Sequence, residues 1–196
     1  MKIGIVGIGT LTLELARRAS LAGFEIIINN PRGNSLIEST VERLGTNVKV
    51  GTILEATVPQ IVLIFIPKDD LETVLKSMPD MAGKTVVHTS SLIFNPKSLL
   101  SGIANAMTYK TTASLLPKAH VVKLLNPIKL EPSDPTLKYD KDEIFFISDH
   151  LESKFTIKAL LKRLNFTTID LSGRVQLQQS LENYPTAVPK STIYKN

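Results

Sequence analysis

The fold is decided by residues 2–12, which read KIGIVGIGTLT. An apolar, strand-forming run ends at Gly7, and a helix-like pattern of apolar residues occupies 11–22. Gly7 permits a tight turn, and Gly9 lets the backbone of a dinucleotide approach where a Cβ would intrude. The free amides that begin a helix favour negative charge, which suits a pyrophosphate. The alternative is a glycine turn that joins strand and helix and binds nothing.

The third position of this glycine pattern is unusual, because Thr12 stands where G-x-G-x-x-G requires a glycine. That glycine normally allows close packing of helix on strand. Thr12 therefore predicts a small outward shift of the helix, or a hydroxyl that compensates by bonding nearby. Thr10 can cap the helix or bond a phosphate. The candidate pyrophosphate turn consists of Gly7, Ile8, Gly9, Thr10, Leu11 and Thr12.

Strand-like and helix-like segments alternate along the chain. The predicted strands are 2–6, 25–29, 48–50, 61–66, 85–88, 120–124, 143–147 and 167–170. The predicted helices are 11–22, 35–44, 70–77, 110–115, 151–164 and 176–183. The strand cores are nearly continuous apolar runs, as expected for strands covered on both faces. This predicts an α/β protein with a three-layer Rossmann-like NAD(P)-binding fold: a mostly parallel twisted sheet, helices on both faces, and residues 7–12 at the topological switch point.

The domain organisation predicted from this pattern is simple. Residues 1–184 are expected to form a single Rossmann-like dinucleotide-binding domain, because the sheet continues nearly to the end. Residues 125–142 contain three prolines and several charges and are expected to be a loop. Residues 185–196 are expected to form a C-terminal tail.

Composition excludes several classes of partner. The net charge is +5, but the basic residues are scattered and not interleaved with aromatics, so no nucleic-acid partner is expected. No apolar run is long enough to span a bilayer, so no membrane partner is expected. The chain contains no cysteine and enters a strand directly after Met1. Both features indicate a cytoplasmic location.

The residues after the second strand indicate which dinucleotide the turn would accept. NAD sites commonly carry an acidic residue there for the ribose 2′-hydroxyl, whereas residues 29–33 read NNPRG. The planar fork of Arg32 suits the 2′-phosphate of NADP. The alternative is a polar turn with a solvated arginine. Together with the glycine turn, the pattern favours NADP(H). Other candidates at this end of the site are Asn30, Pro31, Asn34 and Ser35.

The two turns together resemble the deazaflavin-dependent NADP oxidoreductase family. Later segments add to the resemblance: 64–67 (IFIP), 119–126 (AHVVKLLN), 164–171 (LNFTTIDL) and 181–183 (LEN). The last of these are also similar to the cytosolic domain of transmembrane metalloreductases. This sequence departs from the family at Pro31, where a serine is usual, and at 88–92 (HTSSL), where the family commonly has Asp-Ala-Thr-Asn-Pro.

The resemblance implies hydride transfer between NADPH and a flavin or deazaflavin, and it implies a homodimer. It places the pyrophosphate at Gly7, Gly9 and Leu11 and the 2′-phosphate at Arg32. It also places a nicotinamide pocket between the ends of the first, fourth and fifth strands and residues 121–126. The wall beside the ribose and nicotinamide is implied to be Ile66 and Pro67.

Residues for chemistry are few, because the cofactor carries out hydride transfer and the protein positions it. No catalytic residue is assigned. The candidates are His88, which ends a strand, and Ser90; the alternatives are a histidine bonded to backbone and a polar loop. Ser90 and Asn126 are also candidate cofactor contacts. Lys123 is a plausible pocket residue or a lysine that reaches out from the sheet.

Two other sets of residues are interpreted as non-catalytic. The spacing of His88, His120 and His150 predicts no metal site. Asp69 and Asp70 are interpreted as residues that cap the helix after Pro67.

Three functions remain open. The first is an NADP(H)-dependent oxidoreductase with a small-molecule electron acceptor, where any flavin binds transiently. The second is a non-catalytic NADP(H)-binding module that senses redox state, which the departures at Thr12, Pro31 and 88–92 favour. The third is an imino-acid reductase of the pyrroline-5-carboxylate type. Such enzymes carry a further helical region, whereas this chain is expected to continue its sheet.

Overall fold

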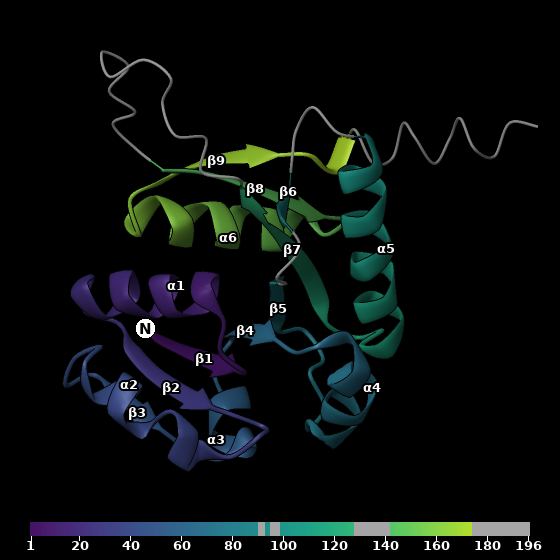
Figure 1. Cartoon of the computed structure of the whole chain (residues 1–196). Helices are drawn as coiled ribbons and strands as arrows, with labels where there is room; N and C mark the ends of the chain where they lie inside the picture. Colours follow the sequence, from purple (N-terminus) through teal and green to yellow (C-terminus); the bar gives the residue numbers. More distant parts are fainter. Residues whose placement is uncertain (90–92, 95–98, 128–141, 174–196) are drawn as a thin grey trace, which may run out of the picture.

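A single twisted sheet runs through the molecule (Figure 1). This computed structural model describes residues 1–89, 93–94, 99–127 and 142–173, and of these the side chains of 93–94, 99–106 and 126–127 are not described. Eight strands follow one another in the order β3-β2-β1-β4-β5-β7-β8-β9, and the short β6 pairs with β7. The strands are β1 (Lys2–Val6), β2 (Glu25–Asn29), β3 (Val48–Val50), β4 (Ile61–Phe65), β5 (Thr85–Thr89), β6 (Ile93–Phe94), β7 (His120–Pro127), β8 (Asp142–Ser148) and β9 (Phe166–Asp170).

The sheet is mostly parallel, as predicted. β1 lies between β2 and β4 and pairs in parallel with both. The strand order therefore reverses at β1, and the turn after Val6 stands at the topological switch point. β8 runs antiparallel to β7, and β9 is parallel to β8. The last two strands thus run opposite to the rest, a direction that the apolar patterning could not indicate.

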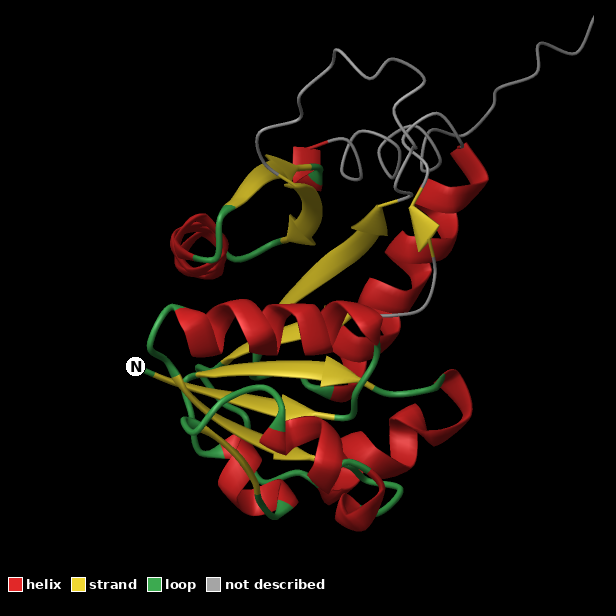
Figure 2. Ribbon diagram, turned by 60° about the vertical axis from the view of Figure 1, so that its left-hand side comes forward, coloured by secondary structure: helices red, strands yellow, loops and turns green. Residues whose placement is uncertain are grey.

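Helices cover both faces of the sheet, which gives the three predicted layers (Figure 2). One face packs on α1 and α6 around residues such as Leu15 and Leu161. The other face packs on α3 and α4, and α5 lies against β7. The helices are α1 (Thr10–Leu21), η1 (Asn34–Leu36), α2 (Glu38–Glu42), α3 (Ile53–Thr57), α4 (Lys68–Ser77), α5 (Leu99–Leu115) and α6 (Leu151–Arg163).

Arg18 on α1 joins the first part of the sheet to the last strands. Its guanidinium pairs with Asp142 at the start of β8 and donates to the carbonyl oxygen of Leu164 at 3.2 Å. It also lies over the ring of Phe166 in β9, 4.1 Å from the centroid. Arg18 is partly buried and contacts a carboxylate, a carbonyl oxygen and an aromatic ring at once. These contacts fix α1 against the C-terminal strands.

Several predicted boundaries differ from the structure. The helix predicted at 110–115 begins already at Leu99. The prediction is too short because the Gly, Ser and Thr residues of this segment have low helix propensity. The helix predicted at 35–44 is divided into η1 and α2, and α3 was not predicted. Residues 125–127, predicted as loop, continue β7. The predicted helix 176–183 and the tail 185–196 lie outside the described residues.

In the part of the chain that the structure describes, no helix has the length and apolar character needed to cross a membrane.

Candidate functional site

The glycine turn is held against the end of β4. The amide of Gly7 donates to the carbonyl oxygen of Asn29 at 2.8 Å, which ties the turn to the end of β2. Gly7 has φ +79°, and a Cβ there would lie 1.9 Å from the backbone oxygen of Phe65. A Cβ at Gly9 would lie 2.8 Å from the Phe65 ring. Packing alone therefore requires glycine at position 7, whereas a Cβ at position 9 would have to displace the Phe65 ring. Phe65 is a determinant that the sequence pattern did not reveal.

Thr12 compensates for the missing third glycine through its hydroxyl. Its Oγ1 accepts from the amide of Gly9 at 2.8 Å and donates to the Gly9 carbonyl oxygen at 3.0 Å. The side chain is fully buried at the contact between α1 and the sheet. This is the second of the two expectations stated for Thr12, a hydroxyl that bonds nearby. It also means that the Gly9 amide is already bonded and is not offered to a ligand.

The first turn of α1 leaves amides available at the carboxyl edge of the sheet. Within the described part of the chain, the amides of Thr10 and Leu11 make no hydrogen bond, as expected for the first residues of a helix. The helix has no acidic residue in its first turn. Positive helix dipole and free donors therefore coincide here, which is the arrangement that binds anions. Ile8 and Leu11 pack against the core beside them.

The turn after β2 is stabilised by its own asparagines. Asn34 Oδ1 accepts from the Asn30 amide at 2.8 Å, and Asn34 Nδ2 donates to the carbonyl oxygen of Gly51 at 2.9 Å. Asn30 Nδ2 donates to the carbonyl oxygen of Gly33 at 3.0 Å. These amide groups therefore shape the turn, and their hydrogen-bonding capacity is largely used within it.

Arg32 stands at the exposed tip of this turn and pairs with a residue of another element. Its Nη2 and Nε lie 2.7 and 3.1 Å from Oδ2 of Asp70, in the first turn of α4. Asp70 thus reaches across to Arg32, which corrects its interpretation as a cap: the N-cap of α4 is Pro67, which has no side-chain bond. Thirty-eight positions separate the two residues, so local sequence could not reveal the contact.

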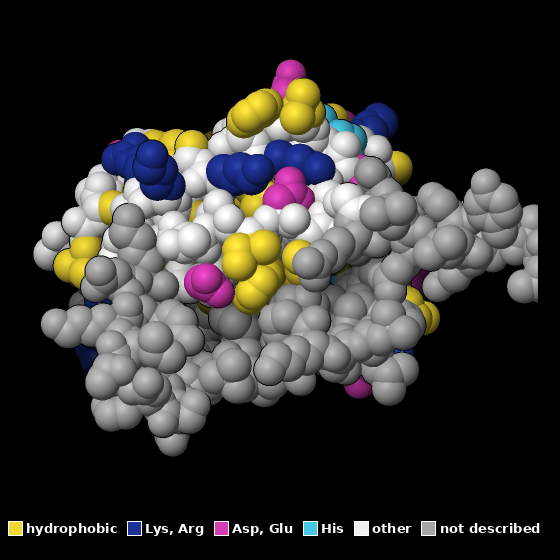
Figure 3. All heavy atoms as spheres, turned by 90° about the horizontal axis from the view of Figure 1, so that it is seen from above, with side chains coloured by type: hydrophobic (Ala, Val, Ile, Leu, Met, Phe, Trp, Pro, Cys, Tyr) yellow, Lys and Arg dark blue, Asp and Glu magenta, His cyan; other side chains and the backbone are white. Residues whose placement is uncertain are grey.

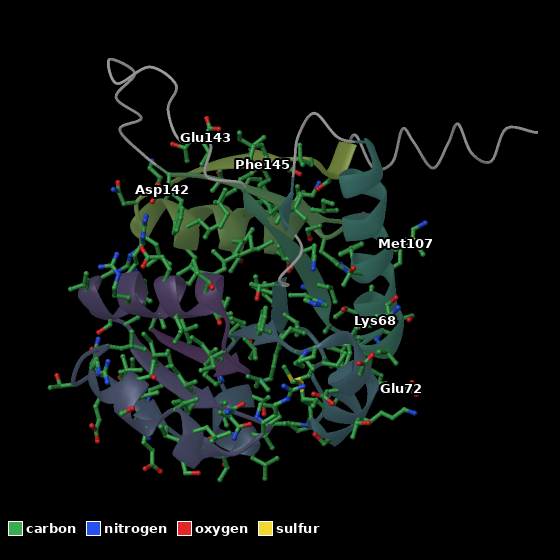
Figure 4. The ribbon with its side chains drawn as sticks, viewed as in Figure 1. Lys68, Glu72, Met107, Asp142, Glu143 and Phe145 are labelled. Carbon is green, nitrogen blue, oxygen red and sulfur yellow. The ribbon has the colours of Figure 1, made fainter. Side chains whose placement is uncertain are left out.

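Of the other predicted cofactor residues, the structure describes Ile66, Pro67 and the backbone of Asn126. Ile66, directly after β4, is buried in the core, and Pro67 after it is exposed. Figure 4 labels Lys68 and Glu72 on α4, the helix that begins next to them. Asn126 lies in β7, in register with Ile93 of β6, and its side chain is not described. Ser90 lies outside the described residues.

His88 and Lys123 form a buried polar pair on the face that α5 covers. They are register partners on β5 and β7, and the exposed fractions of the two residues are 1% and 0%. His88 Nδ1 lies 2.5 Å from Oγ1 of Thr112 on α5. Burial, with a smaller contribution from Lys123, lowers the pKa of His88 to about 3, and burial lowers the pKa of Lys123 to about 7. A neutral, enclosed His88 does not reach a ligand in solvent, so this placement indicates a structural role.

The remaining histidines lie at the opposite edge of the sheet. The rings of His120, which begins β7, and His150, which precedes α6, stack with centroids 4.4 Å apart. Among the described residues no group of three or more histidines, cysteines or carboxylates is arranged to hold a metal. An apolar cavity between the sheet and helices α1 and α6 is lined by core residues such as Leu15, Leu124 and Ile157. It belongs to the packing of the layers, not to the carboxyl edge.

The surface over α6 and β9 mixes charges of both signs (Figure 3). Lys154 Nζ and Lys158 Nζ lie 3.6 and 3.7 Å from Oδ2 of Asp170. Basic side chains on this face are therefore partly neutralised by a neighbouring carboxylate.

Known proteins support the resemblance inferred from the sequence. Residues 2–91 match the model of the family described as NADP oxidoreductase coenzyme F420-dependent. The metalloreductase STEAP3 of Rattus norvegicus is 24% identical over 190 residues, which are 94% of this chain and 36% of that protein. The chain therefore spans about a third of the length of this curated relative.

Solved structures share the fold over most of the chain. A hypothetical protein from Sinorhizobium meliloti has a TM-score of 0.67 and 26% identity, covering 87% of this chain and 85% of its own. An Arthrobacter protein assigned as an F420-dependent NADP-reductase has a TM-score of 0.67 and 18% identity, covering 93% and 95%. An imine reductase from Aspergillus terreus has a TM-score of 0.62 and 17% identity, covering 92% and 59%. The Rossmann-like fold predicted from the sequence is thus confirmed.

Proposed function

We propose that this chain binds NADP(H) and transfers hydride between NADPH and a flavin- or deazaflavin-like small molecule, on the basis that residues 2–91 match the family described as NADP oxidoreductase coenzyme F420-dependent. The observation that carries the proposal is the position of two anion-binding elements at one edge of the sheet. The first turn of α1 supplies free amides, and Arg32 supplies a guanidinium. The bond between Gly7 and Asn29 joins the two turns directly.

The residues present fit a 2′-phosphorylated dinucleotide. The amides of Thr10 and Leu11 would hold the pyrophosphate, while those of Gly7 and Gly9 maintain the turn. Arg32 would hold the 2′-phosphate, and no acidic residue follows β2 within residues 29–37 to favour a free 2′-hydroxyl. Pro67 and the end of β4 border the same edge. When bound, the nicotinamide supplies the hydride, and the chain positions it.

The chain's own residues do little acid–base chemistry in this proposal. His88 is enclosed and its pKa is about 3, so it is not the proton donor of the reaction. Hydride transfer to a flavin-like acceptor requires that the acceptor lies next to the nicotinamide, and it does not require a protein side chain as a base. The sequence contains one glycine turn of the dinucleotide-binding kind, after β1, so the flavin is expected as a transient co-substrate.

The test of cofactor binding is calorimetric titration of NADPH and NADH into the wild type and Arg32→Ala. Loss of a charge-assisted, bidentate contact is expected to weaken NADPH roughly ten- to hundredfold while changing NADH far less. Arg43→Ala is the matched control, because it removes the same charge from an exposed position at the end of α2. Equal weakening of both cofactors by Arg32→Ala would contradict the assignment.

The test of turnover is NADPH oxidation with a panel of flavins, deazaflavin, quinones and ferric chelates. Oxidation with a flavin or deazaflavin supports the proposal. Tight NADPH binding without turnover favours the second candidate, a non-catalytic NADP(H)-binding module. The observation that favours this alternative is that Thr12 occupies the Gly9 amide, a departure at the centre of the binding turn.

A further inference from the structure

The ion pair of Arg32 and Asp70 spans the end of β1. Arg32 follows β2, Asp70 follows β4, and β1 lies between these two strands in the sheet. A contact between them therefore passes over the carboxyl end of β1, where the glycine turn begins. The pair thus joins the two loops that border the proposed nucleotide crevice.

The contact engages the part of Arg32 that a phosphate would use. Both Nε and Nη2 donate to the same oxygen, Oδ2 of Asp70. This is the side edge of the guanidinium, one of the two edges that can take an oxyanion in bidentate geometry. A 2′-phosphate that binds this edge must replace the carboxylate. One that binds the remaining edge stays close to the negative charge of Asp70.

We propose that Asp70 is a specificity-determining residue that competes with the 2′-phosphate for Arg32 and lowers the preference for NADPH over NADH. This inference rests on the proposed NADP(H) binding. A dinucleotide without a 2′-phosphate has no group that binds Arg32, so it leaves the ion pair in place.

The size of the effect follows from exposure. The side chains of Arg32 and Asp70 are 65% and 41% exposed, so solvent screens their attraction. Asp70→Asn is therefore expected to tighten NADPH by about two- to fivefold and to leave NADH unchanged. Asp69→Asn is the matched control: it removes the same charge one residue away, and Asp69 is exposed with no hydrogen bond or ion pair within the described part of the chain.

The experiment is calorimetric titration of both cofactors, at one low ionic strength, into the wild type, Asp70→Asn, Asp69→Asn, Arg32→Ala and the double variant Arg32→Ala/Asp70→Asn. Competition for Arg32 requires that the gain from Asp70→Asn disappears in the Arg32→Ala background. A gain that persists there reports repulsion that does not involve Arg32 and overturns the proposal. An unchanged or weakened NADPH affinity in Asp70→Asn, or an equal gain in Asp69→Asn, also overturns it.

The two proposals fail in different ways. If the wild type binds NADPH and Arg32→Ala weakens it, while Asp70→Asn has no effect, the role of Asp70 fails and NADP(H) binding stands. If the wild type binds neither cofactor, the proposed function fails and the role of Asp70 falls with it.

Discussion

His88 and Lys123 lie opposite each other on β5 and β7, and both side chains are enclosed beneath α5. Two ionisable groups at the centre of a parallel sheet make the stability of the protein depend on pH, because burial disfavours their charged forms.

Lys123 is expected to make the protein more stable at alkaline pH. Its pKa falls from 10.5 to about 7 on folding, so between these values the unfolded chain binds more protons than the folded one. The free energy of unfolding therefore rises with pH from 7 towards 10, with a limiting slope of about 1.4 kcal/mol per pH unit from this group. Urea denaturation at pH 7 and about 9.5 should show that Lys123→Met lacks this part of the slope. Parallel pH dependence in wild type and variant would exclude the effect.

His88 is also expected to make the free energy of unfolding rise with pH, but in the acidic range. Its pKa falls from 6.5 to about 3, so stability present above pH 6.5 is lost as the pH falls towards 3. Replacement by leucine removes this titration. The difference in urea midpoint between wild type and His88→Leu should therefore shift in favour of the variant as the pH is lowered from about 7 to 4. A difference that stays constant over this range would show that His88 does not titrate as its burial requires.

Gly7 is expected to be far less replaceable than Gly23, although their φ angles are nearly equal at +79° and +78°. A Cβ at Gly7 meets the Phe65 backbone oxygen at 1.9 Å, whereas a Cβ at Gly23 meets nothing within 4 Å. Gly23→Ala should cost about 1 kcal/mol for its backbone angle alone, and Gly7→Ala at least about 3 kcal/mol. Thermal and urea unfolding of the two variants measure the difference. Equal losses would mean that the approach of Phe65 has no energetic consequence.

The hydroxyl of Thr12 is expected to contribute to folding independently of any ligand. Thr12→Val keeps the shape of the side chain but leaves the Gly9 amide without its partner, at a cost of about 1–2 kcal/mol in the free energy of unfolding. Thr111→Val is the control, because Thr111 is exposed and its hydroxyl, among the described residues, bonds only the carbonyl oxygen of Met107 in its own helix. A Thr12→Val variant as stable as the wild type would show that water satisfies the turn equally well.

Arg18 is expected to contribute much more to the stability of the fold than its neighbour Arg17, although both bond Glu14. Arg17 is exposed and has this one partner among the described residues, so Arg17→Ala should change stability little. Arg18→Ala also removes the contacts with Asp142, Leu164 and the Phe166 ring, and about 1–3 kcal/mol should be lost. Urea denaturation of both variants tests this. Similar losses would indicate that α1 does not depend on Arg18 for its attachment to β8 and β9.

Much of the fold could be predicted from the sequence because its signals are local. The β1 strand, the turn at Gly7 and Gly9 and the helix after it occupy consecutive residues, and each has a distinct pattern of residue types. Long apolar strands alternating with helices leave few topologies other than a doubly wound sheet. The extent of α5 could not be predicted from local sequence, because its Gly, Ser and Thr residues give only a weak helical pattern. Packing against the sheet stabilises this helix.

The sequence by itself determined the strand, the glycine turn and the helix at the N-terminus, and it led us to propose Arg32 for a 2′-phosphate. Only the tertiary structure decided what surrounds these residues: Phe65 against the glycine turn, Asp70 on Arg32, Lys123 beside His88, and the reversed direction of β8. The physical reason is distance along the chain. A turn or a helix start depends on neighbours within a few residues, whereas an ion pair such as Arg32 with Asp70 forms between residues 38 positions apart that only the strand order brings together.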